Sequence, residues 1–411
     1  MINKQFDIVV FGASSFVGKI LCEYLVNEHK EANLSWAMAG RSQSKLDTLK
    51  KSLGSNANAI PCLLADSMDE AALLEMCEKT AVVISTVGPY ALYGELLVKA
   101  CVETGTDYCD LTGEPQWIRR MISRYESLAV ETGARIVNSC GFDSIPSDLG
   151  VQILQKASLE KFGSYCPQVK MRVVKMKGGA SGGTIASGMN VYKEASRDPA
   201  LREELKDWYS LCPEGHEFIQ RQKSVDCELD TDFDSWAGPF IMASINTRIV
   251  LRSNALVEGF YSPDFLYDEA MLTGNGKKGE KAAKRLARGT KVGFVLMAVG
   301  PIRWLVSKFL VPKPGEGPSP EQQMTGHYEL GFVGTTAESE SIRATVKGDR
   351  DPGYGSTAKM LAQAGISLCR DVDKTEVKGG FWTPATVFGD KYIARLQKYA
   401  GMSFEINGAG D

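Results

Sequence analysis

Small and polar residues near the N-terminus have the spacing of a phosphate-binding turn. The segment Gly12-Ala-Ser-Ser-Phe-Val-Gly18 follows an apolar run at 8–11 and precedes a helical repeat of apolar residues. Gly12 would permit a tight turn, Gly18 would let the helix pack closely on the strand, and free N–H groups at the helix start would bind phosphate. Ser14 and Ser15 can add hydroxyl donors. The placement predicts a dinucleotide pyrophosphate site, and the alternative is a plain strand-to-helix turn.

A basic residue follows the second predicted strand, in the segment Ala39-Gly-Arg-Ser42. Proteins specific for NAD commonly carry an acid here that bonds the ribose 2′-OH, and this chain has none. Arg41, aided by Ser42, can instead pair with a 2′-phosphate, which predicts a preference for NADP. The alternative is a solvated arginine. After the third predicted strand, Asp66 is expected either to bond the adenine amino group or to cap a helix.

The turn Ser85-Thr-Val-Gly-Pro-Tyr90 follows the fourth predicted strand. Its residues offer close backbone approach and a fixed turn, so we expect it to lie under the ribose and nicotinamide; otherwise it is an ordinary turn. The expected cofactor-binding residues are Gly12, Ser14, Ser15, Phe16, Val17, Gly18, Arg41, Ser42, Asp66, Thr86, Val87, Gly88 and Pro89.

Two polar clusters, at 108–114 and 140–148, end the fifth and sixth predicted strands. They border the expected nicotinamide site, so they can bind substrate or relay a proton. The candidate proton donors are Tyr90, Tyr108 and Asp143. The alternative is that Asp143, with neighbouring serines, only caps a helix beginning at 148. No Tyr-x-x-x-Lys pair occurs, which leaves the catalytic acid open.

Strands and helices alternate regularly over residues 7–140. This alternation predicts an α/β fold with a Rossmann-type, doubly wound parallel sheet, whose strand ends meet at one ligand-binding edge. The predicted strands in this region are 8–11, 34–39, 59–64, 82–87, 107–111 and 135–139.

The pattern changes after residue 168, where apolar and basic residues alternate up to 177. With further predicted strands at 241–251, 326–332 and 341–346, this indicates a second α+β domain on a mixed or antiparallel sheet. We therefore expect an NADP-binding domain at 1–147, a substrate or dimerisation domain at 148–350, and C-terminal helices at 351–411 that return to the first domain.

Composition excludes several classes of protein. The 411 residues are 44% hydrophobic and 24% charged, with a net charge of −3, which argues against an electrostatic nucleic-acid binder. The ten cysteines form no Cys-x-x-Cys pair, and the three histidines have no metal-ligand spacing. We expect free thiols, no metal, no signal peptide before the first strand, and a cytoplasmic location.

Segment 291–312 is apolar and follows a run of lysines and arginines. Its uncharged part is too short to span a bilayer. Basic residues beside Phe, Trp and Leu suit a segment that lies on an anionic membrane surface, so a peripheral membrane location is one expectation. A buried helix or a homodimer contact is the alternative.

Five of these motifs together resemble the saccharopine dehydrogenase-like oxidoreductases, and within them the trans-acting enoyl reductase branch. They are 12–18, 39–42, 85–90, 108–114 and 141–148, and the similarity returns at 353–364 and 379–396. The resemblance implies an NADP-binding domain, an α+β second domain and a reductase of lipid or polyketide-derived substrates, with membrane association in some members. The family usually has glycine at the position of Ser15. No catalytic residue is carried over.

The leading hypothesis is an NADPH-dependent reductase that acts on an enoyl or imine group of a hydrophobic substrate. Hydride transfer would take place near Gly88 and Pro89. One alternative is a membrane-associated scaffold that binds the nucleotide without turnover. Another is an amino-acid dehydrogenase, which would place a cluster of arginines in the cleft.

Overall fold

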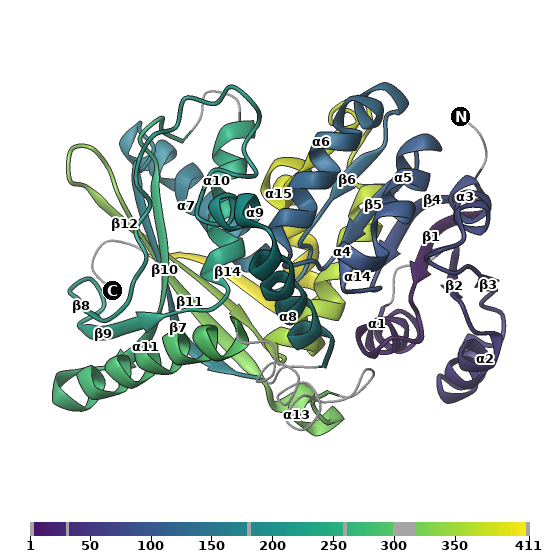
Figure 1. The fold of residues 1–411 in the computed structure, drawn as a ribbon, viewed down its shortest axis with the longest axis horizontal. Coiled ribbons are helices and arrows are strands. Elements are labelled where there is room, and N and C mark those ends of the chain that lie inside the picture. Colours follow the sequence, from purple (N-terminus) through teal and green to yellow (C-terminus); the bar gives the residue numbers. More distant parts are fainter. Residues whose placement is uncertain (1–3, 30–32, 179–181, 258–260, 299–316, 408–411) are drawn as a thin grey trace.

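The first of two large sheets is parallel throughout. The computed structural model describes residues 4–29, 33–178, 182–257, 261–298 and 317–407. Seven strands are ordered β3-β2-β1-β4-β5-β6-β13 (Figure 1). The strands are β1 Phe6–Phe11, β2 Trp36–Gly40, β3 Cys62–Leu64, β4 Thr80–Ser85, β5 Asp107–Asp110, β6 Arg135–Val137 and β13 Gly380–Trp382. The order reverses between β1 and β4, and this switch point is where doubly wound sheets bind ligands.

Helices cover both faces of this sheet, as its side chains require. Ile8 and Val10 of β1 belong to one hydrophobic cluster, whereas Val9 and Phe11 belong to another. Because neighbouring strand residues point to opposite faces, this run of apolar residues is buried on both sides. The helices are α1 Phe16–Asn27, α2 Gln43–Ser52, α3 Glu70–Glu78, α4 Tyr90–Tyr93, α5 Glu95–Glu103, α6 Pro115–Thr132 and α14 Thr357–Arg370.

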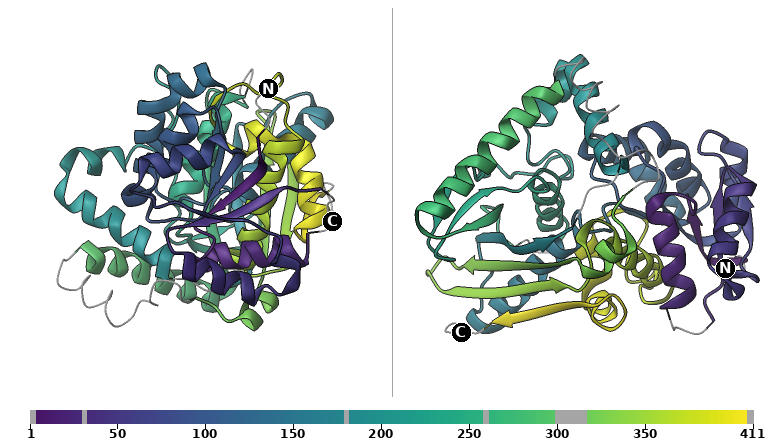
Figure 2. Two further views of the ribbon diagram at one scale, coloured as in Figure 1. Left: turned by 90° about the vertical axis from the view of Figure 1, so that its right-hand side faces the viewer. Right: turned by 90° about the horizontal axis from the view of Figure 1, so that it is seen from below.

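The second sheet is mixed, and with the first it confirms the predicted fold class. Its order is β14-β12-β11-β7-β10-β9-β8, and only the β7–β10 pair is parallel. The strands are β7 Gln168–Lys177, β8 Glu228–Asp230, β9 Ser235–Pro239, β10 Leu266–Gly274, β11 His327–Thr335, β12 Ser341–Gly348 and β14 Met402–Asn407. The remaining helices are α7 Ile145–Phe162, α8 Gly182–Arg197, α9 Pro199–Glu204, α10 Ala243–Leu256, α11 Gly276–Ala298, α13 Pro320–Thr325 and α15 Pro384–Tyr399. Figure 2 shows α11 running beside this sheet.

One predicted strand is wrong. Segment 241–251 lies in the helix α10, which is almost wholly buried. Polar side chains of α10 such as Asn246 and Arg252 are buried as fully as Val250, so polar and apolar residues do not separate into an exposed and a buried face. Without that separation the sequence lacks the helical period. Strands β8, β9, β10, β13 and β14 were not predicted. β10 carries the buried acids Asp268 and Glu269, which interrupt the apolar pattern of a buried strand.

The end of the chain packs on both sheets. Strand β13 extends the first sheet beside β6, and β14 extends the second sheet beside β12. Helix α14 packs on β1, β4 and β5. The boundaries at 147 and 350 stay predictions.

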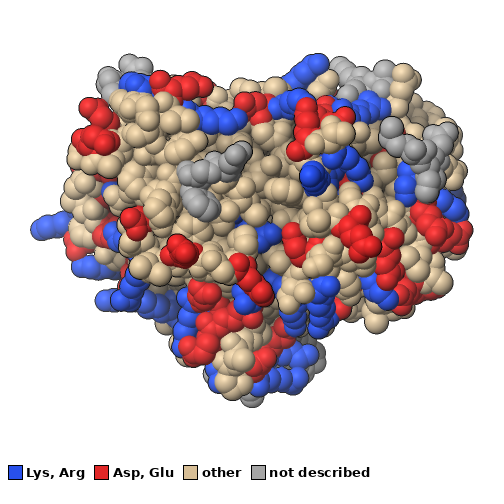
Figure 3. Space-filling view, turned by 90° about the horizontal axis from the view of Figure 1, so that it is seen from above, with Lys and Arg blue, Asp and Glu red and all other residues tan. Residues whose placement is uncertain are grey.

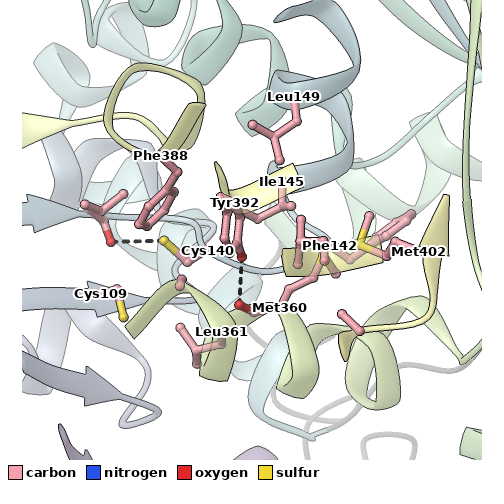
Figure 4. Close-up of a cluster of buried hydrophobic side chains, with 14 of the residues drawn as sticks. Cys109, Cys140, Phe142, Ile145, Leu149, Met360, Leu361, Phe388, Tyr392 and Met402 are labelled. Atoms are coloured by element: carbon pink, nitrogen blue, oxygen red, sulfur yellow. Dashed lines mark hydrogen bonds between the residues drawn. The ribbon is translucent and has the colours of Figure 1, made fainter. Parts of the chain in front are cut away.

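The two sheets share a hydrophobic core where the loop after β6 meets the C-terminal helices. Figure 4 shows Phe142 and Ile145 beside Tyr392 of α15 and Met360 of α14. The buried Tyr392 hydroxyl donates to the Met360 carbonyl oxygen at 2.7 Å. This packing fixes the loop after β6 at the carboxyl edge of the first sheet.

Acidic and basic side chains are interspersed on the face seen in Figure 3. Among the described helices, none is long and apolar enough to cross a membrane. Of the segment 291–312 that was predicted to lie on a membrane surface, residues 299–312 are outside the described part of the chain.

Candidate functional site

The turn after β1 has two positions that only glycine fits. Gly12 has a φ of +83°, and a Cβ placed on it would lie 2.6 Å from Val87 Cγ2 and 2.8 Å from Thr86 Oγ1. A Cβ on Gly18 would lie 2.2 Å from the Gly12 carbonyl oxygen. Glycine at position 12 lets the turn lie against the end of β4, and glycine at position 18 lets α1 pack closely on β1. The turn therefore presents the start of α1 at the switch point, as a pyrophosphate site requires.

Ser15, where the family usually has glycine, caps α1. Its Oγ accepts a hydrogen bond from Gly18 N at 2.9 Å and lies 2.9 Å from Thr86 Oγ1. Thr86 Oγ1 also lies 2.9 Å from the Gly12 carbonyl oxygen, to which it can only donate. In the hydrogen bond between the two hydroxyl groups, Ser15 Oγ is therefore the donor and Thr86 Oγ1 the acceptor. In this arrangement the Ser15 hydroxyl holds the turn against the end of β4. Phosphate binding by Ser14, Ser15 and the backbone N–H groups of Phe16 and Val17 stays a prediction.

Arg41 lies at the carboxyl end of β2, beside this turn. A Cβ placed on Gly40 would lie 3.9 Å from Ser14 Oγ, so the two strand ends are adjacent. The Arg41 side chain is exposed and forms no hydrogen bond or ion pair with any described residue. Ser42 is the N-cap of α2 and accepts from Lys45 N at 3.4 Å. An unpaired guanidinium next to the turn fits a 2′-phosphate, and this role stays a prediction.

Asp66 forms a local turn and does not cap the helix that follows. Its Oδ1 accepts from Met68 N at 3.0 Å, whereas Asp69 is the N-cap of α3. The adenine contact predicted for Asp66 stays a prediction.

Glu114 holds the turn after β4 in place. Its two carboxylate oxygens accept from Tyr90 N at 2.8 Å and Ala91 N at 3.1 Å, so it caps the short helix α4 directly after Pro89. Burial raises the pKa of Glu114, although these hydrogen bonds and one from Ser187 of α8 oppose the shift. Glu114 belongs to the polar cluster at 108–114 that was predicted to bind substrate or relay a proton, and that role stays a prediction. Its contact with α4 was not predicted, since Tyr90 and Ala91 follow a different strand.

Tyr90 and Tyr108, two of the predicted proton donors, have buried hydroxyl groups that bond within the protein. Tyr90 donates to the Ser85 carbonyl oxygen at 3.0 Å, and Tyr108 donates to Asp110 Oδ2 at 2.9 Å. Burial raises the pKa of both phenols well above the ordinary value. These contacts stabilise the strand ends and leave neither hydroxyl available without a rearrangement.

Asp110 joins the ends of β5 and β6. Its carboxylate accepts from Ser139 N at 3.0 Å and Asn138 Nδ2 at 2.8 Å, besides Tyr108. Burial raises the pKa of Asp110 to about 6. The role of this residue is to hold the loop that carries Asp143.

Asp143 differs from the other two candidates. Its carboxylate is half-buried and forms no hydrogen bond with the described part of the chain. A Cβ placed on Gly113, the neighbour of Glu114, would lie 3.7 Å from Asp143 Oδ2. Burial, with the nearby charge of Asp110, raises the pKa of Asp143 to about 7. A carboxyl group that titrates near neutral pH at the sheet edge can hold and deliver a proton.

A polar network connects the Asp143 loop to the second sheet. The Ser144 hydroxyl lies 3.3 Å from Asn246 Oδ1, and Asn246 Nδ2 donates to Glu269 Oε2 at 2.9 Å. Tyr267 donates to the other oxygen of Glu269 at 2.7 Å. Burial raises the pKa of Glu269 to about 7. The sequence does not indicate this network, because Asn246 of α10 and Glu269 of β10 are far from Ser144 along the chain.

The predicted capping by residues of this loop is wrong. Helix α7 begins at Ile145, and the Ser144 side chain makes no capping hydrogen bond. Asp148 lies inside α7 and accepts from Ala385 N at 2.8 Å, at the start of α15. Within the described ranges, no group of three His, Cys, Asp or Glu side chains could hold a metal ion.

Known proteins resemble this chain over most of its length. Residues 8–137 match the family described as the saccharopine dehydrogenase NADP binding domain. A trans-acting enoyl reductase of Mycobacterium bovis (strain BCG / Pasteur 1173P2) is 39% identical over 409 residues, covering 96% of this chain and 96% of that protein. A trans-acting enoyl reductase of Mycobacterium ulcerans (strain Agy99) is 35% identical with the same coverage.

A solved structure shares the fold. Apo saccharopine dehydrogenase (L-Glu forming) from Saccharomyces cerevisiae superposes with a TM-score of 0.52 at 12% identity, covering 98% of this chain and 100% of that one. At this identity the likeness concerns the fold alone.

The family match confirms NADP(H) as the cofactor, and the cradle at Gly12 with the unpaired Arg41 fits it. The relatives are named as enzymes, and the scaffold alternative finds no support among them. The chain is an NADP-dependent oxidoreductase, and it belongs to the saccharopine dehydrogenase-like family, in the branch of the trans-acting enoyl reductases.

Proposed function

We propose that this protein reduces the conjugated double bond of a hydrophobic enoyl substrate, lipid or polyketide-derived, and that Asp143 delivers the proton. The observation that carries the proposal is the half-buried Asp143 carboxyl at the sheet edge, which has no hydrogen bond to any described residue and a pKa raised to about 7. The names of the relatives favour an enoyl over an imine substrate.

The chain's own residues have two tasks in this reaction, to position the nicotinamide and to deliver a proton. When bound, NADPH would supply the hydride that the β-carbon of the substrate accepts. The turn at Gly88 and Pro89, held by Glu114, would position the nicotinamide. Protonated Asp143 gives its proton to the α-carbon, and the carboxylate then regains a proton from solvent. Hydride and proton together convert the C=C bond to a saturated bond.

The test is the oxidation of NADPH, followed by absorbance, with a medium-chain 2-enoyl thioester. NADPH carrying deuterium at the transferred position labels the product. We expect a saturated product with one deuterium on the β-carbon. Tight NADPH binding without turnover on enoyl or imine substrates would instead favour the scaffold alternative.

The amino-acid dehydrogenase alternative predicted arginines that face a cleft. Two buried arginines of α10 are already engaged with backbone carbonyl groups. Arg248 donates to Leu205 O at 2.6 Å, and Arg252 donates to Phe381 O at 2.6 Å. These contacts give them a structural role, and no observation favours an amino-acid substrate.

Contact with an anionic membrane surface is a further part of the proposal. Basic side chains are exposed along α11, and Val292 and Val295 near its end are 55% and 65% exposed. Sedimentation with anionic and neutral vesicles tests it: binding to anionic vesicles alone, lost at high salt, is expected. A salt-independent homodimer with no vesicle binding would favour the dimer alternative.

A further inference from the structure

The turn at Gly88 and Pro89 has a polar neighbour from a helix outside the first sheet. Ser187 lies on α8, which follows β7 of the second sheet. A Cβ placed on Gly88 would lie 3.7 Å from Ser187 Oγ, so this hydroxyl is beside the backbone that is expected to carry the nicotinamide. The residue is half-buried. Ser187 is therefore in a position to contact a nicotinamide ring that lies on this turn.

Contacts with the helices of the first sheet fix the position of α8, which lies between the two sheets in the view of Figure 1. Glu194 of α8 accepts from Arg120 of α6 at 3.1 Å and from Asn190, within α8, at 2.6 Å. Ser187 is seven residues before Glu194, and residues at this spacing lie on the same face of a helix. The face of α8 that meets α6 is therefore also the one that carries Ser187.

Glu114 determines which way the Ser187 hydroxyl points. The carboxylate of Glu114 accepts from Tyr90 N and Ala91 N, and Ser187 hydrogen-bonds to the same carboxylate. An ionised carboxylate can only accept, so Ser187 is the donor in this contact. A serine hydroxyl has one proton and two lone pairs, so its oxygen keeps the capacity to accept a further hydrogen bond. The group that Ser187 can recognise beside Gly88 is therefore an N–H or O–H donor.

We propose that Ser187 accepts a hydrogen bond from the carboxamide NH₂ of the nicotinamide and so sets the orientation of the ring. This NH₂ is the one hydrogen-bond donor of the reduced nicotinamide ring. The contact would fix the rotation of the ring about its bond to the ribose, and hence which face of the ring meets the substrate. This inference rests on the proposed reduction and on the expected place of the nicotinamide at Gly88, and it adds the residue that orients the ring.

The loop after β5 connects Ser187 to the proposed proton donor. A Cβ placed on Gly113 would lie 3.7 Å from Asp143 Oδ2, and Glu114, the next residue, bonds Ser187. Two neighbouring residues of one loop thus contact the group that orients the hydride donor and the group that would deliver the proton. Ser187 is in this account a positioning residue for the cofactor, whereas Asp143 takes part in the proton transfer.

The test compares NADPH with its reduced 3-acetylpyridine analogue, in which a methyl ketone replaces the carboxamide. The analogue keeps the carbonyl oxygen but has no NH₂ group to donate. Calorimetric titration of the wild type should show that NADPH binds roughly fivefold more tightly than the analogue, the usual effect of one hydrogen bond. Ser187→Ala should weaken NADPH binding by about the same factor and leave the affinity for the analogue unchanged, so that the preference is lost.

Ser196→Ala is the matched control. It makes the same substitution on α8 at an exposed serine, whose hydroxyl donates to Lys193 O at 2.8 Å. This variant should keep the wild-type preference for NADPH. Equal wild-type affinities for NADPH and the analogue would overturn the inference without any variant. An equal loss of affinity for both in Ser187→Ala would also overturn it, because a serine that merely holds α8 against Glu114 cannot distinguish the two cofactors.

Turnover of an enoyl thioester separates this inference from the proposed function. Enoyl reduction by the wild type, together with a preference for NADPH that Ser187→Ala retains in full, would overturn the inference and leave the reductase intact. A preference that Ser187→Ala abolishes, without turnover on any enoyl substrate, would support the role of Ser187 and contradict the proposed reaction.

Discussion

At the scale of single residues, the cofactor turn shows how one substitution can be accommodated. Ser15 keeps the turn closed because its hydroxyl caps α1 and joins Thr86 at 2.9 Å. Gly12 and Gly18 have no such freedom, since a Cβ on either would overlap neighbouring atoms. The family's usual glycine at position 15 is therefore not required for the turn to form.

Arg41 is expected to decide between NADPH and NADH. It is exposed and free of partners among the described residues, so its charge is available for a 2′-phosphate. We expect Arg41→Ala to weaken NADPH binding roughly 10- to 100-fold and to leave NADH binding unchanged, measured by titration calorimetry. An equal loss for both nucleotides would assign Arg41 to another part of the cofactor.

At the scale of elements, the structure explains which predictions held. The first six strands of the parallel sheet were predicted because each is an apolar run between helical repeats. Helix α10 was mistaken for a strand because nearly all its residues are buried. The network of Asn246 and Glu269 could not be foreseen, since it depends on pairing between elements far apart in the sequence.

The contact of Glu114 with α4 is expected to control the turn at Gly88. Glu114→Gln keeps the size of the side chain but replaces one acceptor oxygen with an NH₂ group, which cannot accept from Tyr90 or Ala91 N–H. We expect a loss of about 1–3 kcal/mol in the free energy of unfolding and a higher KM for NADPH. Urea denaturation measures the free energy of unfolding, and steady-state kinetics measures the KM. An unchanged KM for NADPH would show that the turn does not depend on this cap.

At the scale of the whole molecule, carboxyl groups are buried where the two sheets meet. Burial raises the pKa of both Asp148 and Glu269 to about 7. Asp148 of α7 accepts hydrogen bonds from Ser253 at 2.5 Å and from Ala385 N at 2.8 Å, so it joins three helices. These groups hold protons in the folded state that the unfolded chain releases near pH 4.

Stability should therefore fall as pH rises. Between about pH 4 and pH 7 the folded protein binds more protons than the unfolded chain, so the free energy of unfolding decreases with pH and levels off above 7. Asp148→Asn, whose amide oxygen can accept from Ala385 N while its NH₂ group donates to Ser253 Oγ, should reduce this decrease. Urea unfolding of the wild type and the variant at pH 5.5 and 8.5 measures the change in the free energy of unfolding. An equal change in both proteins would exclude a protonated Asp148.

The proposed role of Asp143 as proton donor can be tested by the pH dependence of kcat for NADPH-dependent enoyl reduction. Since Asp143 must be protonated and its pKa is raised to about 7, wild-type kcat should fall above pH 7. Asp143→Asn should lower kcat about 10²- to 10⁴-fold and flatten the profile, whereas the surface variant Asp390→Asn should match the wild type. A wild-type rate and profile in Asp143→Asn would contradict the account.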